Sequence, residues 1–318
     1  MSSSETTDAA TKRSKAKTKV EASPSKDDER MLTKCAGGKA WVVSRFPHLL
    51  PKPEDVRIMH EPFVGGGAVM KHYLGRVPVR VNDKNAKLMA VYAAVRDEPE
   101  SLIKILQLMR YDKDEFYRTR TAFNERWFQE EIAMRAAWFI YLNRTCFNGL
   151  YRENKLGHFN VPFGDYKNPL ICDADGIRAW SEKLRKSNRM LYSIVGTAFG
   201  QLGVGDFQPT FDLVGYGDFV FLDCPYVPVN DTTAKFTEYQ AGGFSMADQE
   251  RLAACLPLLD RKGVRFLFTN AGIARELYKG WNILEVAVPR AINSKAGKRG
   301  KVPEIFVSNY PLTDPTKA

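Results

Sequence analysis

Short apolar runs alternate with helical patterns along most of the chain. Four of the runs are rich in β-branched and aromatic residues: Val56–His60, Val77–Val81, Phe219–Leu222 and Val264–Phe268. Nearly continuous apolar runs of this length are typical of strands buried in a parallel sheet. The pattern therefore predicts an α/β fold.

A capping box marks the start of one helix between the last two runs. Ser245 and Asp248 have the spacing of a capping box, and Leu252, Leu256 and Leu259 follow at helical intervals. Gly263 can end the helix, because glycine adopts the left-handed conformation of a helix C-terminus. This segment predicts a strand, helix, strand unit.

The middle of the chain, residues 88–172, has a different character. Glu131–Tyr141 carries Ile132, Ala136 and Ile140 at helical spacing, and the flanking stretches are rich in Arg, Asn and aromatic residues. We expect a mostly helical insertion here, which divides the α/β domain into a first part, residues 31–87, and a second part, residues 173–318.

Two further strands are predicted near the C-terminus, at Ile283–Val288 and Glu304–Tyr310. The connection between them carries basic residues and no acidic residue. Such a loop can hold a phosphate backbone. Its candidate DNA contacts are Arg290, Lys295, Lys298 and Arg299.

Composition narrows the class of protein. The 318 residues have a formal net charge of +10 and a pI near 9.3, which favours an acidic partner such as nucleic acid, although positive charge can also serve solubility alone. Residues 1–30 contain few large apolar side chains, and we expect a disordered polar tail. Its basic cluster, Lys12 to Lys19, either attracts phosphates or is simply solvated.

Cysteine and histidine usage indicates neither disulfides nor a metal. The 5 cysteines are widely spaced and form no C-x-x-C pair, and the 4 histidines lack ligand spacing. No apolar run approaches the ~18 residues of a membrane span, and no signal core is present. We expect a metal-free, monomeric protein of the cytoplasm, associated with the nucleoid.

A carboxylate, a turn and an aromatic ring follow the third apolar run. Asp223 and the carbonyl of Cys224 can accept hydrogen bonds from an exocyclic amine, Pro225 stiffens the turn, and Tyr226 can stack on a flat ring. This combination is suited to chemistry on the amine of a planar base.

A glycine loop follows the first apolar run. Gly65, Gly66 and Gly67 come after Glu61 and Phe63, and allow a nucleotide-like ligand to approach the backbone, although a simple tight turn would look the same. The pattern is neither G-x-G-x-x-G nor a Walker motif. Asp83 ends the next run, where nucleotide-binding sheets place an acid on a ribose hydroxyl.

A third group of residues lies in the middle of the chain. The stretch from Asn143 to Tyr166 contains Asn148, Arg152 and several aromatic residues. Asn and Arg can make paired hydrogen bonds to base edges, and aromatic rings can stack on bases. An ordinary turn at Asn148-Gly149 is the alternative.

Together these residues resemble the Dam-like family of DNA N6-adenine methyltransferases, from Lys34 to Tyr310. Lys34–Lys39 is similar to the family's K-W-A-G-G-K, Glu61–Val69 to E-P-F-V-G-x-G, and Asp223–Tyr226 to D-P-P-Y. Asn143–Tyr166 is similar to N-R-x-x-x-N-G-L-x-R-x-N followed by F-N-V-P-F-G-x-Y.

The resemblance implies a Rossmann-like domain that uses S-adenosylmethionine, with an inserted helical target-recognition domain, acting on double-stranded DNA. The implied catalytic residues are Asp223, Cys224, Pro225 and Tyr226. The implied cofactor-binding residues are Cys35, Gly37, Gly38, Lys39, Glu61, Phe63, Gly65, Gly67, Asp83 and Asp223. The implied DNA contacts, besides the basic loop, are Lys34, Phe147, Asn148, Leu150, Arg152, Pro162 and Asp165.

Three positions depart from the family pattern. Cys35 replaces a tryptophan beside the cofactor, which predicts weaker donor binding, and Cys224 replaces the first proline of the catalytic tetrapeptide. Asp165 stands where relatives that methylate GATC carry a guanine-reading arginine, and a carboxylate would accept from cytosine instead. We therefore expect an adenine methyltransferase that does not strictly recognise GATC.

Two alternatives remain open at this point. The tetrapeptide can handle any planar exocyclic amine, so RNA adenine or cytosine N4 are possible targets. From a different class, the chain can be a DNA-binding protein derived from a methylase, in which Cys35 and Cys224 have removed activity. Binding of S-adenosylmethionine separates the two classes, because a binding module does not need it.

Overall fold

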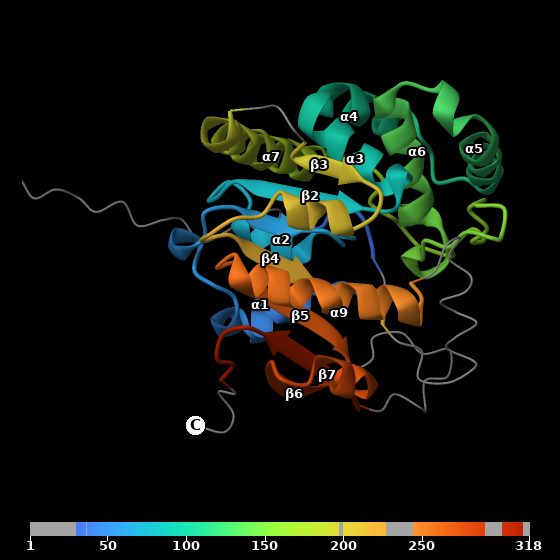
Figure 1. Ribbon diagram of the computed structural model, residues 1–318. Coiled ribbons are helices and arrows are strands. Elements are labelled where there is room, and N and C mark those ends of the chain that lie inside the picture. Colours follow the sequence, from blue (N-terminus) through green and yellow to red (C-terminus); the bar gives the residue numbers. More distant parts are fainter. Residues whose placement is uncertain (1–29, 36, 197–199, 227–243, 290–300, 314–318) are drawn as a thin grey trace, which may run out of the picture.

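The computed structural model describes residues 30–35, 37–196, 200–226, 244–289 and 301–313. These form a central sheet with helices on both faces and a group of helices beyond one end (Figure 1). The predicted tail, except Arg30, and the four basic residues of the predicted phosphate-binding loop lie outside the described residues.

The sheet has seven strands in the order β3-β2-β1-β4-β5-β7-β6. The first five in this order are parallel, and β7 runs antiparallel to both of its neighbours. The strands are β1 Met59–Glu61, β2 Val79–Asp83, β3 Leu202–Val204, β4 Phe219–Leu222, β5 Arg265–Ala271, β6 Asn282–Pro289 and β7 Lys301–Ser308. In open sheets of this kind, ligands bind beyond the carboxyl ends of the parallel strands.

Alternate residues of the central strands face two separate cores. In β4, Phe219 and Phe221 join a core that includes β1, β2 and the middle helices, whereas Val220 and Leu222 join the core under α9. All four side chains of β4 are fully buried. A strand buried on both faces explains why its sequence is continuously apolar rather than alternating.

The helices are divided between the sheet and the region beyond it. Figure 1 shows α9 lying across β4 and β5, while α4, α5 and α6 gather at the upper right. The longer helices are α3 Ala86–Asp97, α4 Pro99–Leu108, α5 Lys113–Arg126, α6 Ile132–Thr145, α7 Ala174–Val195 and α9 Met246–Arg261. The short ones are α1 Ala40–Arg45, α2 Ala68–Tyr73, η2 Pro47–Leu49, η3 Pro53–Asp55, η4 Trp127–Gln129, η5 Phe147–Gly149, η6 Gln208–Asp212 and η7 Gly272–Tyr278.

The predicted elements are present, and apart from Phe219–Leu222 the predicted strands have shifted ends. All four predicted apolar strands form, and the capping box of Ser245 and Asp248 starts α9 as expected. The sequence reading gave no element for α7 or β3, although α7 has 22 residues. In α7, polar residues separate the buried apolar positions, and β3 has only 3 residues. Neither segment therefore forms a continuous apolar run in the sequence.

Within the described ranges, no helix combines the length and the apolar character needed to cross a membrane.

Candidate active site and nucleic-acid interface

The predicted catalytic turn begins directly after β4, at the carboxyl end of the parallel strands. Asp223 Oδ1 accepts a hydrogen bond from Thr269 Oγ1 at 2.8 Å and is 2.9 Å from Lys39 Nζ. Lys39 is 7% exposed and also donates to the carbonyl of Gly37 at 3.1 Å. The structure thus brings the N-terminal motif and the catalytic turn into direct contact.

Tyr226 is held in the same place by two contacts. Its hydroxyl donates to Glu304 Oε2 at 2.7 Å, and Lys39 Nζ lies 4.7 Å from the centre of its ring. Burial, together with Asp223 and Glu304 nearby, raises the pKa of Tyr226 well above its usual value. The side chain is therefore a neutral phenol whose ring is fixed in orientation.

Cys224 points away from this face into the core under α9. It is 1% exposed, and burial raises the pKa of its thiol far above the usual range, so it is neutral. Its Sγ lies 3.5 Å from Gln249 Nε2, which also donates to the carbonyl of Pro225 at 2.8 Å. Gln249 was missed by the sequence reading, although a polar residue on the apolar stripe of α9 is a detectable signal.

The predicted glycine loop connects β1 to α2. Gly65 and Gly67 have φ of 47° and 73°, a conformation that favours glycine. A Cβ at Gly67 would lie 2.7 Å from Tyr92 Oη, whereas a Cβ at Gly65 would meet nothing within 4 Å. The loop is therefore packed against α3 on one side and open at Gly65.

Asp83, at the end of β2, supports this loop. Its Oδ2 accepts from the backbone N–H of Gly65 and its Oδ1 from that of Asn85, both at 2.9 Å. Burial raises the pKa of Asp83, and these two hydrogen bonds oppose the change. The carboxylate is half-buried, which leaves part of it accessible to a ligand hydroxyl.

Glu61 is more deeply buried than the sequence suggested. It is 3% exposed, and its Oε2 accepts from the N–H of Met70 at 2.7 Å. Burial raises the pKa of Glu61 well above its usual value; the hydrogen bond from Met70 opposes this, and the charges of Asp223 and Asp83 add to it. The three carboxyl groups of Glu61, Asp83 and Asp223 therefore lie close enough to influence one another.

Aromatic rings border the other side of the loop. Phe63 packs against Phe207 and Phe244, with ring centroids 5.2 Å and 5.5 Å apart. Phe207 is beside Asp206, which forms a double hydrogen bond with Arg251. Neither Phe207 nor Asp206 was identified from the sequence, because they follow the short strand β3 rather than an apolar run.

The N-terminal motif also contacts the predicted recognition segment. Asn143, which is 1% exposed, accepts from the N–H of Lys34 at 2.7 Å and donates to the carbonyls of Lys34 and Gly149. Lys34 Nζ lies 4.4 Å from the centre of the Tyr166 ring. Cys35 is exposed beside Gly66, and Gly37 has φ of 77° and open space around it. Gly38 lies in the same turn, where its N–H donates to the carbonyl of Cys35.

A tight turn at η5 presents the first predicted DNA contacts. Asn148 has φ of 55°, and Phe147 is 51% exposed. The N–H of Phe147 donates to the carbonyl of Pro162 at 2.9 Å, which joins the turn to the second half of the motif. Leu150 is half-buried behind the turn, and Pro162 is exposed. These four residues lie in one neighbourhood.

Arg152 and Asp165 are both exposed on the same segment. Arg152 Nε donates to Asn160 Oδ1 at 2.8 Å, which fixes the direction of its guanidinium group. Asp165 lies between Gly164 and Tyr166, whose positions are fixed by Tyr111: Tyr111 Oη donates to the carbonyl of Gly164 and accepts from the N–H of Tyr166, both at 2.6 Å. Asp165 is therefore presented from a rigid backbone.

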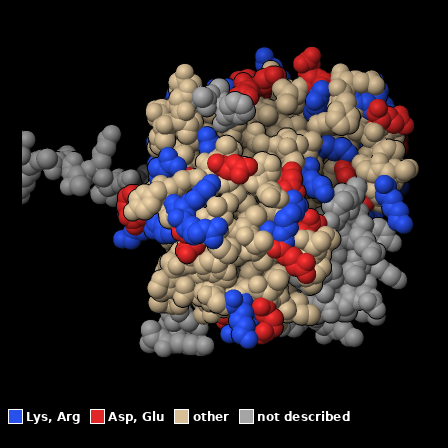
Figure 2. Space-filling view, in the orientation of Figure 1, with Lys and Arg blue, Asp and Glu red and all other residues tan. Residues whose placement is uncertain are grey.

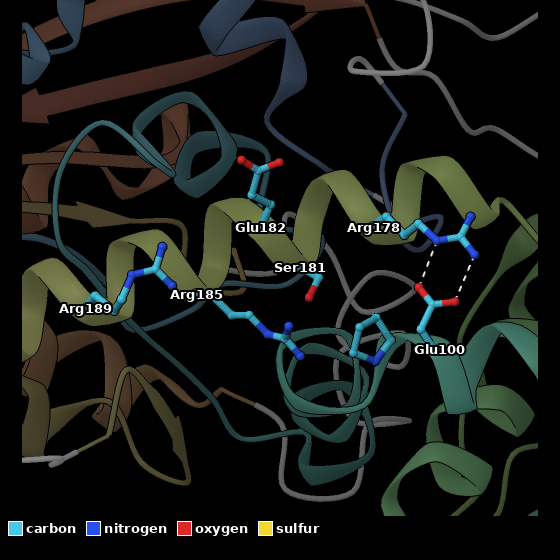
Figure 3. Close-up of a pocket in the computed structure, with 7 residues that line it drawn as sticks. Glu100, Arg178, Ser181, Glu182, Arg185 and Arg189 are labelled. Carbon is cyan, nitrogen blue, oxygen red and sulfur yellow. Dashed lines mark hydrogen bonds and ion pairs between the residues drawn. The ribbon is translucent and has the colours of Figure 1, made fainter.

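A surface groove of about 350 Å³ lies apart from these residues, between α4 and α7 (Figure 3). Arg178 forms two 2.8 Å hydrogen bonds with Glu100 across it, so opposite charges neutralise each other there. It is lined by Pro99, Glu100, Arg178, Ser181, Glu182, Arg185 and Arg189. None of the predicted site residues borders it, and we place the functional site at the strand ends.

Charged side chains of both signs are interspersed over the face shown in Figure 2. Among the residues that the structure describes, no group of three His, Cys, Asp or Glu side chains is arranged to hold a metal ion.

Comparison with known proteins shows the family of the chain. A family model described as D12 class N6 adenine-specific DNA methyltransferase matches residues 36–292. The chain is 37% identical to the type II methyltransferase M1.LlaDCHI of Lactococcus lactis subsp. cremoris, over 88% of this chain and 95% of that protein. It is 36% identical to the type II methyltransferase M.MjaIII of Methanocaldococcus jannaschii, over 87% and 98% of the two chains. It is 31% identical to the DNA adenine methylase of Vibrio cholerae, over 87% and 95%.

Proposed function

Because this chain belongs to the D12 class of N6 adenine-specific DNA methyltransferases, we propose that it methylates an adenine turned out of duplex DNA at a specific site. The observation that carries the proposal is the pairing of Asp223 and Tyr226 at the carboxyl end of β4. The first offers a hydrogen-bond acceptor and the second an aromatic face, as an exocyclic amine on a flat ring requires.

S-adenosylmethionine is the methyl donor that the family implies, and the described residues suit it. The donor carries a sulfonium and an ammonium group, and Glu61, Asp83 and Asp223 create negative potential around the loop. The open space above Gly65 and the ring of Phe63 fit a ligand that lies against the backbone. Cys35 supplies a smaller contact than the tryptophan expected from the family.

In this proposal the protein acts mainly by orientation. The bound donor supplies a reactive methyl group, and proximity to it provides most of the acceleration. Asp223 and the carbonyl of Cys224 accept the two N–H groups of the adenine amine, so that the nitrogen lone pair faces the methyl group. Tyr226, whose ring is fixed by Glu304, stacks on the base. The base leaves its stack at a cost of a few kcal/mol.

Lys39 already makes the contacts that we assign to the target base. Its ammonium group pairs with Asp223 at 2.9 Å and lies over the ring of Tyr226 at 4.7 Å. We infer that it holds these groups in place before DNA arrives and moves aside when the adenine amine takes its position. The arrangement supports the use of Asp223 and Tyr226 for a flat group that carries N–H donors.

The test is a single-turnover methylation assay with Asp223→Asn and the unchanged protein. The carboxamide keeps the size of the side chain but loses an acceptor, so we expect methyl transfer to fall by on the order of 10²-fold or more while DNA binding stays within about threefold. Transfer at an unchanged rate would contradict the assignment. Failure of the unchanged protein to bind the donor would instead favour a DNA-binding protein without activity.

We further propose that the recognised sequence differs from GATC at an outer base pair. Asp165 is exposed on the recognition segment, and a carboxylate can only accept hydrogen bonds, so it cannot pair with guanine O6 or N7. Modified-base sequencing of DNA from a methylation-free host tests this point. Asp165→Arg should move the preference toward guanine at that position. Strict GATC methylation by the unchanged protein would contradict the proposal.

A further inference from the structure

Gln249 is a buried polar residue in the first turns of α9, on the same stripe as Leu252, Leu256 and Leu259. It is 1% exposed. An unpaired amide in such a core would cost stability, so its hydrogen-bond partners determine whether the position can hold a polar group. The side-chain partners are Cys224 and Pro225 of the catalytic turn, Asn270 on β5 and Tyr278 on η7.

The partners determine which way the Gln249 amide faces. Asn270 Oδ1 accepts from the N–H of Ala271 at 2.8 Å, so the amide nitrogen of Asn270 faces Gln249. Gln249 Oε1 accepts from this nitrogen at 3.1 Å and from the Tyr278 hydroxyl at 3.0 Å. The Nε2 group must therefore face the other way, where it donates to the carbonyl of Pro225 at 2.8 Å.

This hydrogen bond acts on a segment that needs support. The strand β4 ends at Leu222, one residue before the turn, and Pro225 has no N–H of its own to anchor the backbone. Turning the carbonyl of Pro225 toward α9 fixes the peptide plane between Pro225 and Tyr226, and the ring of Pro225, whose φ is fixed, links this plane to the preceding peptide that carries the Cys224 carbonyl. The orientation of the Cys224 carbonyl and of the neighbouring Tyr226 then depends on Gln249.

We propose that Gln249 is a positioning residue for methyl transfer, which holds the Pro225 carbonyl so that the catalytic turn presents its acceptors to the target amine. This inference rests on the proposed function, because it explains how the acceptors of the catalytic turn are held in the orientation that methyl transfer requires. Asn270 and Tyr278 act one step further back, because they set the orientation of the Gln249 amide. Gln249 itself touches neither the donor nor the base.

The first test compares Gln249→Met with Leu256→Ala. Methionine keeps the length of the side chain and removes its hydrogen bonds, whereas Leu256 lies further along α9, is fully buried and has a side chain that forms no hydrogen bond. We measure melting temperature, the dissociation constants of S-adenosylmethionine and DNA, and the single-turnover rate. An Å-scale misplacement of reacting groups can cost on the order of 10²-fold in rate.

We expect Gln249→Met to lose about that factor in rate, with both dissociation constants within about threefold of the unchanged protein. Leu256→Ala should lower the melting temperature while the rate per folded molecule remains close to normal. Rates that fall in proportion to stability in both variants would overturn the proposal. The proposal would also be overturned if weaker binding of the donor or of DNA fully explained the lower rate of Gln249→Met.

A second test uses Gln249→Glu and does not depend on the folding of the methionine variant. A protonated carboxyl can still donate to the Pro225 carbonyl, whereas the ionised form places oxygen against oxygen. The titratable groups that face this position are the Cys224 thiol and the Tyr278 hydroxyl, with the Asn270 amide completing its surroundings.

We expect the rate of Gln249→Glu, divided by that of the unchanged protein at each pH, to fall at least tenfold as the pH rises and the new carboxyl ionises. A ratio that stays constant with pH would overturn the role assigned to the Nε2 donor. The outcome is distinct from failure of the proposed function, since in that case the unchanged protein itself would not transfer a methyl group.

Discussion

At the strand ends, the acidic side chains that the structure describes outnumber the basic ones. This excess of acidic groups favours the binding of a cationic ligand. Lys39 provides the positive charge recorded beside Asp223, while Glu61 and Asp83 lie close enough to add to the negative potential. Burying several carboxylates together destabilises their ionised forms. Under the proposed function, the binding of a positively charged donor would relieve this cost, so that part of the affinity for the donor would come from the instability of the free protein.

Replacing Glu61 by Gln separates these two effects. The pKa of Glu61 is raised in the folded protein, so the carboxylate lowers stability as the pH rises from the unfolded value of about 4.3 through the folded value. Glutamine can still accept from the N–H of Met70. We expect Glu61→Gln to melt higher than the unchanged protein at pH 8, with a smaller difference at pH 5.

The same substitution should weaken donor binding by about tenfold, equivalent to ~1.4 kcal/mol, because one negative charge is lost. Calorimetric titration with S-adenosylmethionine checks this, and Glu54→Gln, at an exposed position on η3, is a matched control for the loss of one acid. A melting temperature below that of the unchanged protein at both pH values would show that the ionised carboxylate is stabilising.

Cys224 departs from the proline of the family tetrapeptide, and the structure gives its side chain no role at the reacting face. Its thiol is buried under α9 and neutral, and only its carbonyl is assigned to the target amine. Proline fixes φ near −65° and fills a similar volume. We expect Cys224→Pro to keep at least half of the single-turnover rate, with Cys224→Ala as the control for loss of the thiol contact to Gln249.

At the scale of elements, the sequence predicted those strands and helix ends that a local residue pattern specifies. Phe219–Leu222 matches β4 residue for residue, and the capping box at Ser245 gives the start of α9. The ends of β1 and β2 were placed too early, because the runs Val56–His60 and Val77–Val81 begin in apolar residues that precede the ladder. The candidate site was predicted from family motifs rather than from periodicity.

What the sequence did not predict depends on contacts between distant segments. Thr269 and Glu304 meet around the catalytic turn because β4, β5 and β7 are neighbours in the sheet, and Lys39 reaches the same turn from the start of α1. No local pattern encodes these meetings. Gln249 was within reach of sequence reasoning, since it interrupts an apolar stripe, but its partners on β5 and η7 were not.

Substitutions in the predicted recognition segment, Asn143–Tyr166, should affect DNA binding differently from substitutions at the predicted phosphate contacts. Arg152 is exposed and oriented by Asn160, so we propose that it reads a base edge. Arg152→Ala should reduce discrimination at one position of the site by about 1–3 kcal/mol, and Asn160→Ala should have a smaller effect of the same kind.

Lys298→Ala, in the loop that the sequence predicts to bind phosphates, is the comparison. This substitution should weaken binding to all DNA sequences alike. It should also reduce the slope of log K against the logarithm of the salt concentration by about one unit. Binding titrations over a range of salt with matched and mismatched duplexes measure both properties. Identical salt slopes and identical discrimination for Arg152→Ala and Lys298→Ala would contradict this division of roles.

For the molecule as a whole, the edge opposite the site is held by a buried ionic cluster. His60 Nε2 lies 3.0 Å from Asp218 Oδ2, and Arg57 forms a double hydrogen bond with the same carboxylate. Burial opposes ionisation of Asp218, but the hydrogen bonds from His60, the Gly215 N–H and Arg57 outweigh it and lower its pKa. The cluster joins β1 to the start of β4 through side chains, in addition to the backbone hydrogen bonds between the two strands.

This cluster predicts that the whole molecule loses stability in mild acid. Burial lowers the pKa of His60, the hydrogen bond to Asp218 opposes this, and Arg80 and Arg57 add to it, so the ring is neutral when folded. Unfolding lets it take a proton, and stability therefore falls as the pH drops below about 6.5. Asp218 adds a second loss at lower pH, as the carboxylate is protonated below its folded pKa.

His60→Gln cannot be protonated and can still donate to Asp218, so its melting temperature should decline less between pH 7 and pH 5 than that of the unchanged protein. His48→Gln, at an exposed position, should follow the unchanged protein, and parallel curves for all three would mean that His60 is not the group whose protonation opens this edge of the sheet.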